Sequence, residues 1–387
     1  MKTIRTILLV LTVFLLACSK DKLIENTTKN LTIFFVNDVH GQIDNFAKVK
    51  HIIDTEREKT NVIVAASGDM FSGNPVVDNH PEKGFPIIDV MNQIGFDISI
   101  LGNHDFDYGT SALKDRISQS DFEWICANVD MENTGVPQTN AYSTISVGDL
   151  KVTFLGLVET GGKPGDVIPS THPWKVKNFT FERAETIVWQ YEQTKKVENS
   201  DLFIALSHLG YSGYEDEMGD VQLAQQNNFF DMIIGGHNHL LIDEMVNNIP
   251  IFQSGGYLKY LGKIELTVNN KSIQTANFEL IELENYIEYD SELKALIDDY
   301  NDLPYLQEVI GYSHQFHERN QVGCFYTDAM RLQMNVDVAF QNTGGIRSSL
   351  DEGDITIREI YEIEPFNNGT VIYEMTVAEI KEFLVGT

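Results

Sequence analysis

Five short apolar runs in this chain each end in a cluster of polar and ionisable side chains. One run, residues 97–101, leads directly into Gly102, Asn103, His104 and Asp105. A short apolar run bounded by turn residues is typical of a buried strand. An amide, an imidazole and a carboxylate are costly in a core without partners, but they suit a binding site at the carboxyl edge of a sheet. We therefore expect the five strand ends to converge on one centre.

The polar residues at the other four ends complete a set of metal-ligand types. In an extended strand, side chains at i and i+2 point the same way, so two residues with one residue between them can share an ion. Seven oxygen and nitrogen donors are too many for one tetrahedral ion and suit two ions joined by a shared carboxylate. Without thiolate, the set favours Zn²⁺, Mn²⁺ or iron. The seven candidates are Asp38, His40, Asp69, Asn103, His208, His237 and His239.

Strand-like and helix-like segments alternate along the first 284 residues. Continuous apolar strands separated by helices predict an α/β domain in which both faces of the sheet are covered. Residues 249–253, 262–268 and 273–280 are expected to be antiparallel strands that close this sheet, and residues 179–195 have helical periodicity. We expect the first domain over 31–284, an acidic linker helix over 285–310, and a second domain over 311–387 that contains a strand at Val336–Phe340.

The first 17 residues have the pattern of a bacterial lipoprotein signal peptide. Lys2 and Arg5 precede an apolar run that is too short to span a bilayer, and the run closes with Leu-Leu-Ala before Cys18, which resembles a lipobox. We expect cleavage before Cys18, lipid attachment to its side chain, and a polar tether over 18–30 that holds the protein at a bacterial membrane, on the periplasmic or the outer face. The alternative is an ordinary signal peptide with an incidental cysteine.

Charge and cysteine content exclude two classes of protein. A formal net charge of −29 argues against nucleic-acid polymers as partners, because phosphate backbones need basic surfaces. Only Cys126 and Cys324 remain once Cys18 is lipidated, and two cysteines in apolar surroundings do not make a disulfide scaffold.

In their order along the chain, the five motifs resemble the five blocks of the calcineurin-like metallophosphatases. Residues 36–41 and 103–107 narrow the resemblance to the branch of bacterial 5′-nucleotidases and UDP-sugar hydrolases. It implies a four-layer α/β/β/α sandwich, followed by a smaller α/β nucleotide-binding domain that is incomplete at its end. The motifs are Asp38-Val-His40, Gly68-Asp69, Gly102-Asn-His104, Ser207-His208 and Gly235-Gly-His237-Asn-His239.

The resemblance also implies a role for each motif residue. Asp69 would bridge two metal ions, and a hydroxide between them would attack phosphorus in line. His104 would stand beside the phosphate, oriented by Asp107, while Asp105 stands where the family often has glutamate. The remaining ligands divide into Asp38, His40 and His239 for one ion, and Asn103, His208 and His237 for the other.

The second domain resembles the nucleotide-recognition domain of the same branch. Residues 342–347 and 364–369 are similar to its two recognition blocks. The resemblance implies that Arg347 binds carboxylate or phosphate groups, that Phe366 stacks on the base, and that Asn368 hydrogen-bonds it. Arg319 is a candidate for a second basic contact.

Two departures from the family pattern stand out. Thr343 replaces a glycine beside Arg347, and the second aromatic that sandwiches the base has no candidate before Thr387.

These features predict a metal-dependent hydrolase that cleaves nucleotide phosphomonoesters to nucleoside and phosphate, with nucleotide sugars as further substrates. One alternative is a 2′,3′-cyclic-nucleotide phosphodiesterase or 3′-nucleotidase that uses the same metal site. Another is a non-catalytic surface lipoprotein that binds nucleosides. Retention of both His104 and Asp107 argues against the non-catalytic binder, which needs neither.

Overall fold

The computed structural model describes residues 28–213 and 217–385. The predicted signal peptide, Cys18 and most of the tether lie outside the described residues. Within the described ranges, no helix is both long enough and apolar enough to cross a membrane.

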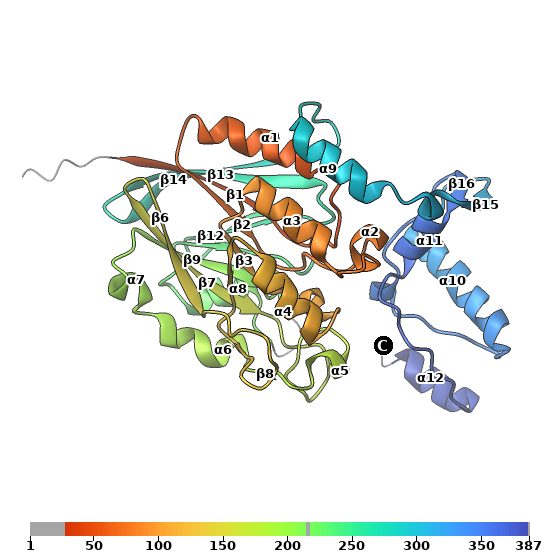
Figure 1. The fold of residues 1–387 in the computed structure, drawn as a ribbon. Helices are drawn as coiled ribbons and strands as arrows, with labels where there is room; N and C mark the ends of the chain where they lie inside the picture. Colours follow the sequence, from red (N-terminus) through yellow and green to blue (C-terminus); the bar gives the residue numbers. More distant parts are fainter. Residues whose placement is uncertain (1–27, 214–216, 386–387) are drawn as a thin grey trace, which may run out of the picture.

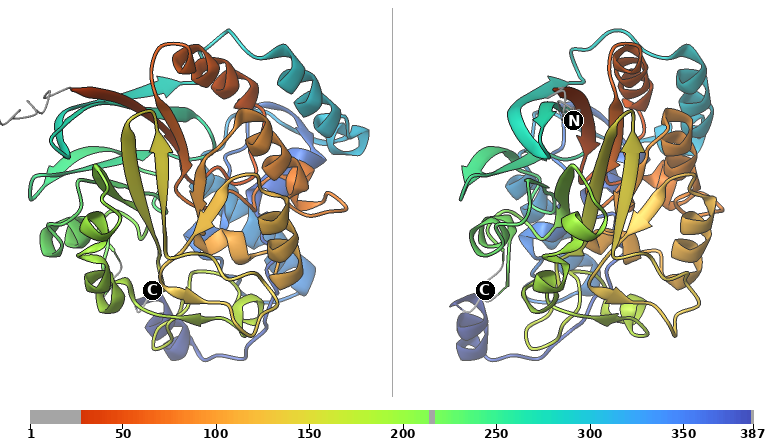
Figure 2. Two further views of the ribbon diagram at one scale, coloured as in Figure 1. Left: turned by 60° about the vertical axis from the view of Figure 1, so that its left-hand side comes forward. Right: turned by 90° about the vertical axis from the view of Figure 1, so that its left-hand side faces the viewer.

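Two six-stranded sheets form the centre of the first domain (Figures 1 and 2). The first sheet has the order β14-β13-β1-β2-β3-β4, and the second has the order β11-β12-β10-β9-β7-β6. The strands of the first sheet are β1 (Lys29–Val36), β2 (Val62–Ala66), β3 (Ile98–Ile100), β4 (Glu123–Ile125), β13 (Tyr260–Asn269) and β14 (Ser272–Glu282). The strands of the second sheet are β6 (Tyr142–Val147), β7 (Leu150–Val158), β9 (Leu202–His208), β10 (Met232–Ile234), β11 (Leu241–Val246) and β12 (Ile249–Ser254).

The late strands do not close a single sheet, so that part of the sequence-based prediction is wrong. β12 lies parallel to β10 in the second sheet, whereas β13 and β14 extend the first sheet on the antiparallel side of β1. Local periodicity identifies these strands but carries no information about which sheet each one joins, because pairing partners are distant in sequence.

Side chains that alternate along the strands build the four layers. On β1, Leu31, Ile33 and Phe35 face the core between the two sheets, while Phe34 and Val36 face the helical layer. Burying a side chain of this size contributes roughly 1.5–3 kcal/mol, so the two-sided burial of each strand is a main source of stability. The α/β/β/α arrangement expected from the family resemblance is confirmed.

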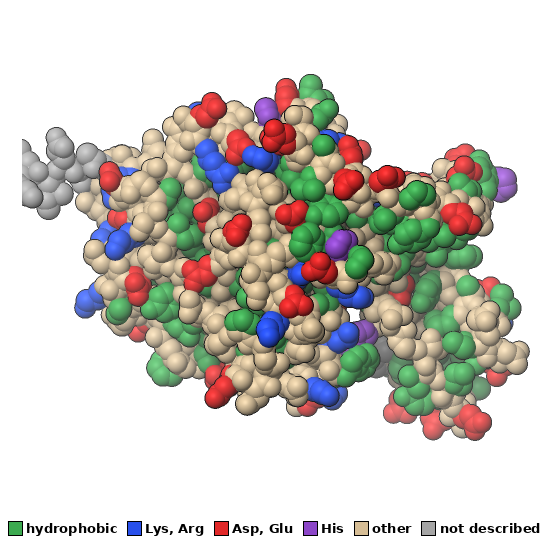
Figure 3. Space-filling model, viewed as in Figure 1, with side chains coloured by type: hydrophobic (Ala, Val, Ile, Leu, Met, Phe, Trp, Pro, Cys, Tyr) green, Lys and Arg blue, Asp and Glu red, His purple; other side chains and the backbone are tan. Residues whose placement is uncertain are grey.

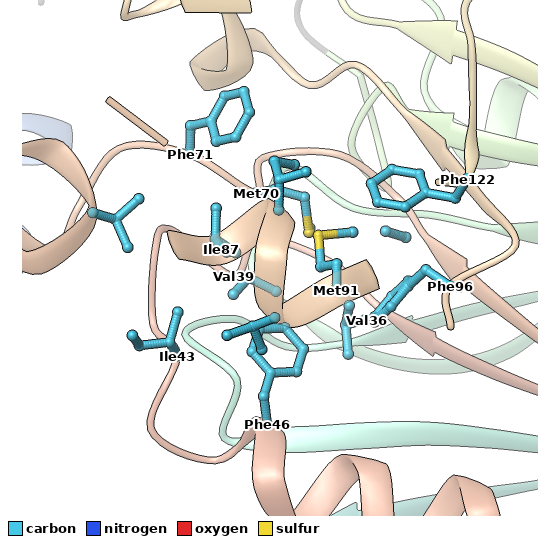
Figure 4. Packing of buried hydrophobic residues seen from close by; sticks show 14 of the residues in the cluster. Val36, Val39, Ile43, Phe46, Met70, Phe71, Ile87, Met91, Phe96 and Phe122 are labelled. Atoms are coloured by element: carbon cyan, nitrogen blue, oxygen red, sulfur yellow. The ribbon is translucent and has the colours of Figure 1, made fainter. Parts of the chain in front are cut away.

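Helices cover the outer face of each sheet. Figure 4 shows Phe46, Ile87 and Met91 packed near Val36 in the layer over the first sheet. This layer comprises α1 (Phe46–Arg57), α3 (Phe85–Ile94), α4 (Thr110–Gln119) and α9 (Ser291–Asn301), and the second sheet is covered by α6 (Ala184–Ile187) and α8 (Asp220–Gln226).

The predicted linker contributes to the packing of the first domain. Leu293 and Ile297 of α9 are buried in the helical layer over the first sheet. Asp290 caps this helix, since its Oδ1 accepts a hydrogen bond from Leu293 N at 2.8 Å. The segment over 285–310 is therefore a packed helix as well as a connection.

The predicted helix over 179–195 is broken into short pieces. Strand β8 (Thr180–Phe181) pairs with β5 (Val129–Asp130), and Glu182 N donates to Asn128 O, so the chain is extended there. Helix α6 begins only at Ala184, and the 3₁₀ turn η2 (Val188–Tyr191) separates it from α7 (Thr194–Val197). Tertiary pairing overrides the helical period at the start of this segment.

The second domain is built around one pair of short antiparallel strands and three helices. Strands β15 (Val309–Ser313) and β16 (Gly353–Thr356) pair antiparallel, and the helices are α10 (Arg319–Met334), α11 (Ile357–Ile363) and α12 (Val377–Val385). A small core is formed by Val322, Ile346, Leu350 and Ile363. Figure 3 shows many apolar side chains exposed on this domain, whereas acidic side chains are spread over the visible face of the whole molecule.

The strand predicted at Val336–Phe340 is absent from the described structure. These residues are irregular, and Val338 and Phe340 are 48% and 42% exposed. A strand needs a neighbour for its backbone N–H and C=O groups, and no described segment pairs with this one. An apolar run alone is therefore insufficient evidence for a strand.

Candidate metal centre

The structure brings all seven predicted ligands together where strands of both sheets end. In two groups, Asp38 with His40 and His239, and Asp69 with His208 and His237, the ligand atoms lie within 4.8 Å of one another. Asp69 Oδ2 lies 3.1 Å from His208 Nε2 and 3.9 Å from His40 Nε2, so this carboxylate stands between the groups. Asn103 Oδ1 lies 2.9 Å from His237 Nδ1 and joins the second group.

Parallel pairing explains why these residues meet. β1, β2 and β3 run parallel in the first sheet, and β9 and β10 run parallel in the second, so each sheet presents its carboxyl ends at one edge. Ser67 follows β2, and its Oγ lies 2.9 Å from both Ser207 O and Ile234 O. One buried hydroxyl therefore joins the edges of the two sheets directly beneath the centre.

Asn37 makes a second connection between the sheets. Its Oδ1 accepts from Ser254 N and Ser254 Oγ at 2.8 Å, and its Nδ2 donates to Gly255 O at 2.6 Å and to Asp38 Oδ2 at 2.7 Å. The amide thus ties the end of β1 to the end of β12 while it orients a predicted ligand.

The pairs at i and i+2 do not converge by strand alternation, so that reason for their convergence is wrong. Asp38, His40, His237 and His239 have φ values of 52°, 51°, 78° and 55°, and Asp69 has a φ of 56°. These left-handed conformations turn the side chains toward one centre. Such backbone strain costs on the order of 1–3 kcal/mol per residue and is typical of functional sites.

Backbone hydrogen bonds hold the strained ligands. Asp38 N donates to Gly68 O and His40 N donates to Asp69 O, each at 3.0 Å, so the loops after β1 and β2 fix each other. Gly68 allows this contact, because it has a φ of +84° and a Cβ there would lie 2.6 Å from His208 Nδ1.

The hydrogen bonds of two histidines fit metal binding. His40 Nδ1 lies 2.9 Å from Ser72 O, and His208 Nδ1 lies 2.7 Å from Ser67 O. A carbonyl only accepts, so Nδ1 carries a proton and Nε2 is the nitrogen that faces the centre. His208 Nε2 is buried and makes no hydrogen bond within the described part of the chain. These residues therefore fit a pair of divalent cations.

Electrostatics produce the protonation states that most ligands need. Burial raises the pKa of Asp69, but the nearby His208 and His104 outweigh it and hold the pKa well below its usual range. Burial lowers the pKa of His237 to about 3, with a further contribution from the charge of His208. Burial opposes protonation of His208, but Asp69 and Asp38 raise its pKa to about 10, so a bound cation would displace that proton.

His104 and Asp107 form a hydrogen-bonded pair beside the metal groups. His104 lies in the 3₁₀ turn η1 (Asn103–Phe106), and its Nδ1 is 2.7 Å from Asp107 Oδ2. Asp107 also accepts from Ser72 Oγ at 2.7 Å and Thr171 Oγ1 at 2.6 Å. Burial lowers the pKa of His104, but Asp107 and Asp69 outweigh it, so the pKa is raised.

The structure shows the role of Asp105, which the sequence left open. Its buried carboxylate accepts hydrogen bonds from Gly102 N at 2.8 Å, Asp69 N and Met70 N at 3.0 Å, and Phe71 N at 3.1 Å. This one side chain therefore holds the loop after β2 against the loop after β3.

Three of the four predicted substrate-binding residues face the metal groups. Arg347, Phe366 and Asn368 line a cavity of about 470 Å³ together with His104 and His237. Arg319 lies away from the described lining, and its Nη2 donates to Thr343 O at 2.8 Å. Arg319 thus supports the loop that carries Arg347.

The contacts of Arg347 and Phe366 place the second domain over the centre. Phe366 stacks on His104 with ring centroids 4.8 Å apart and an interplanar angle of 15°. Arg347 Nη2 lies 3.0 Å from His40 Nε2 and 3.3 Å from His239 Nε2. Since one lone pair cannot accept from Arg347 and ligate a cation at once, metal binding at His40 requires this guanidinium to move.

Tyr257 is a site residue that the sequence analysis missed. Its N donates to Asp38 O at 2.7 Å, and its ring centroid lies 5.2 Å from that of His40 and 5.1 Å from that of His239. A signal was present, because Gly255 and Gly256 precede it after a strand in the same pattern that precedes His237. No comparable sequence pattern indicated the contacts that Asn37, Ser72 and Thr171 make in the site.

Family models match most of the described chain. A calcineurin-like phosphoesterase model matches residues 31–241, and a 5′-nucleotidase C-terminal domain model matches residues 305–386. The resemblance inferred from the five motifs is thereby confirmed.

Individual relatives are similar over nearly the whole chain. The trifunctional nucleotide phosphoesterase YfkN of Bacillus subtilis is 29% identical over 92% of this chain, which spans only 27% of that protein. A 5′-nucleotidase of Vibrio vulnificus is 25% identical over 93% of this chain and 76% of its own length. The crystal structure of a 5′-nucleotidase precursor from Thermus thermophilus shares the fold, with a TM-score of 0.78, 22% identity, and coverage of 88% of this chain and 74% of that one. With its two ligand groups and its family match, the chain belongs to the calcineurin-like phosphoesterase family.

Proposed function

We propose that this protein is a metal-dependent 5′-nucleotidase that hydrolyses nucleotide phosphomonoesters to nucleoside and phosphate. The observation that carries the proposal is the position of Asp69 between two ligand groups, with the His104–Asp107 pair and Arg347 facing the same cavity. Similarity to the Vibrio 5′-nucleotidase supports the choice of substrate.

Two divalent cations would be held by the two ligand groups. Asp38, His40 and His239 would hold one ion, Asn103, His208 and His237 the other, and Asp69 would contact both. Bound there, the ions would lower the pKa of water and offset the charge that develops on the phosphate. Imidazole, carboxylate and amide ligands favour Zn²⁺, Mn²⁺ or iron.

His104 would act on the phosphate without binding a metal. Asp107 only accepts, so Nδ1–H of His104 donates to it, and Nε2 is left to face the substrate. The raised pKa favours the protonated ring, which can donate to a phosphate oxygen or to the departing 5′-oxygen.

The second domain would bind the nucleoside part. The guanidinium of Arg347 has the planar donor geometry that suits phosphate and carboxylate groups. Phe366 would stack on the base, and Asn368 lines the same cavity beside it. Nucleotide sugars are further candidate substrates of this open cavity.

We also propose that the mature protein is lipid-anchored through Cys18 to a bacterial cell-envelope membrane. The pattern of residues 1–18 supports this proposal.

A substrate panel tests the choice of reaction. With Mn²⁺ or Zn²⁺ added, kcat/KM for AMP should exceed that for 3′-AMP and 2′,3′-cyclic AMP by at least about tenfold, because the second domain would orient the 5′-phosphate toward the metals. Phosphate release measures each rate, and UDP-glucose reports on nucleotide sugars. Preference for 3′-AMP or the cyclic substrate would favour the phosphodiesterase alternative, and no turnover of any ester would favour the binder.

Replacement of His104 separates chemistry from metal binding. His104→Ala should retain both metal ions and lose about 10²–10⁴-fold in kcat, since it removes a proton donor and no ligand. Elemental analysis and AMP kinetics on the same sample measure both quantities. His314→Ala, at an exposed histidine of the second domain, is the matched control and should change neither. Loss of metal with activity would show that His104 is a ligand.

Replacement of Cys18 tests the anchor. The wild-type protein should fractionate with membranes and incorporate labelled palmitate, whereas Cys18→Ser should do neither, because the variant lacks the acceptor thiol. Cys324→Ser is the control and should behave as the wild type. An unlabelled wild-type protein in the soluble fraction would support the ordinary signal peptide instead.

A further inference from the structure

The loop over 160–172 forms one wall of the cavity. It follows the end of β7 and leads into α5 (Pro173–Val176). Gly162, Ser170, Thr171 and His172 from this loop line the cavity, and His172 Nε2 lies 3.4 Å from Phe366 O of the second domain. The five motifs include none of these residues.

Two consecutive residues of this loop contact the centre. Ser170 O accepts a hydrogen bond from Asn103 Nδ2 at 2.9 Å, and Thr171 Oγ1 donates to Asp107 Oδ1 at 2.6 Å. The first contact turns the amide so that Asn103 Oδ1 points toward His237 Nδ1. The loop thus orients both a metal ligand and the carboxylate that holds His104.

One buried carboxylate fixes the two ends of this loop. Glu159 is 2% exposed, and its Oε1 accepts from Ser170 N at 2.5 Å while its Oε2 accepts from Gly161 N at 2.8 Å. Its own backbone N donates to His208 O at 3.1 Å. Glu159 therefore connects Ser170 to the strand end that carries a metal ligand.

A second carboxylate offers a matched comparison. Glu217 accepts from Thr160 N at 3.2 Å and pairs with Arg183 Nη1 at 2.7 Å. It supports the start of the same loop but makes no described contact with Ser170 or Thr171. Its replacement removes a clamp on the loop without removing the contact that orients Asn103.

We propose that Glu159 is a positioning residue that, through Ser170, orients Asn103 toward the metal ion of the second ligand group. Through Thr171 the same carboxylate stabilises the orientation of Asp107. The expected effect of Glu159 on catalysis rests on the proposed function. Its expected effect on metal affinity does not depend on which substrate the protein hydrolyses. Replacement of a residue that orients a metal ligand by a hydrogen bond typically lowers metal affinity or activity by about 10–100-fold.

Calorimetric titration of metal-free protein with Mn²⁺ tests the proposal. Glu159→Gln keeps the size of the side chain but replaces one of the two acceptor oxygens with a donor. It should lower the affinity for one of two Mn²⁺ ions by about 10–100-fold and leave the affinity for the other ion within about threefold of the wild type. For AMP, kcat should fall more than KM rises. Glu217→Gln should leave both affinities within about threefold of the wild type.

A double-mutant cycle tests the route through Asn103. Asn103→Ala alone should lower the affinity for the same ion. Adding Glu159→Gln should cause no further loss of affinity, because Glu159 acts through the amide of Asn103. If Glu159→Gln does not fold, Glu159→Asp shortens the reach by one carbon and should give the same loss. Unchanged Mn²⁺ affinity in a folded variant, or additive losses in the cycle, would overturn the proposal. Wild-type protein that binds two Mn²⁺ ions but hydrolyses no nucleotide would contradict the proposed function alone.

Discussion

The close approach of two sheet edges is the constraint on which the rest of the site depends. The predicted ligands that follow β1, β2 and β3 come from one sheet, and those that follow β9 and β10 come from the other. Ser67 and Asn37 fix the distance between the edges with buried hydrogen bonds that cross from sheet to sheet. Because the inter-sheet core lies behind these contacts, its packing sets how closely the loops after β1 and β2 approach the loops after β9 and β10.

Backbone strain and buried charge are concentrated at this edge. Five of the predicted ligands adopt left-handed backbone conformations, and the carboxylates of Asp38 and Asp69 are almost wholly buried. Groups of this kind are costly unless their surroundings satisfy them. Backbone N–H groups and imidazoles satisfy the two carboxylates in part, the carboxylate of Asp105 holds the backbone N of Asp69, and a pair of cations would supply the rest.

Much of the site could be predicted from the sequence, because its ligands follow apolar strands and have distinctive chemistry. The residues of the core and the positions of most strands could also be predicted, because apolar residues recur along the chain with the periods of strands and helices. Long-range pairing could not be predicted this way, as shown by the division into two sheets, the broken helix near Ala184 and the irregular segment at 336–340. Loop geometry was equally hidden, so the parts played by Glu159 and Ser170 emerged only from the structure, whereas Tyr257 follows a pair of glycines that could have indicated it.

The carboxylate of Asp69 would be shared by two cations, and counting bound ions in the wild type and in Asp69→Asn distinguishes a shared carboxylate from separate sites. Titration of metal-free protein with Mn²⁺ should give two ions per wild-type chain. In Asp69→Asn both should bind far more weakly, because the bridging charge is lost from both groups at once. A wild-type chain that binds one ion or none, or an Asp69→Asn variant that binds both ions as the wild type does, would rule out a shared Asp69.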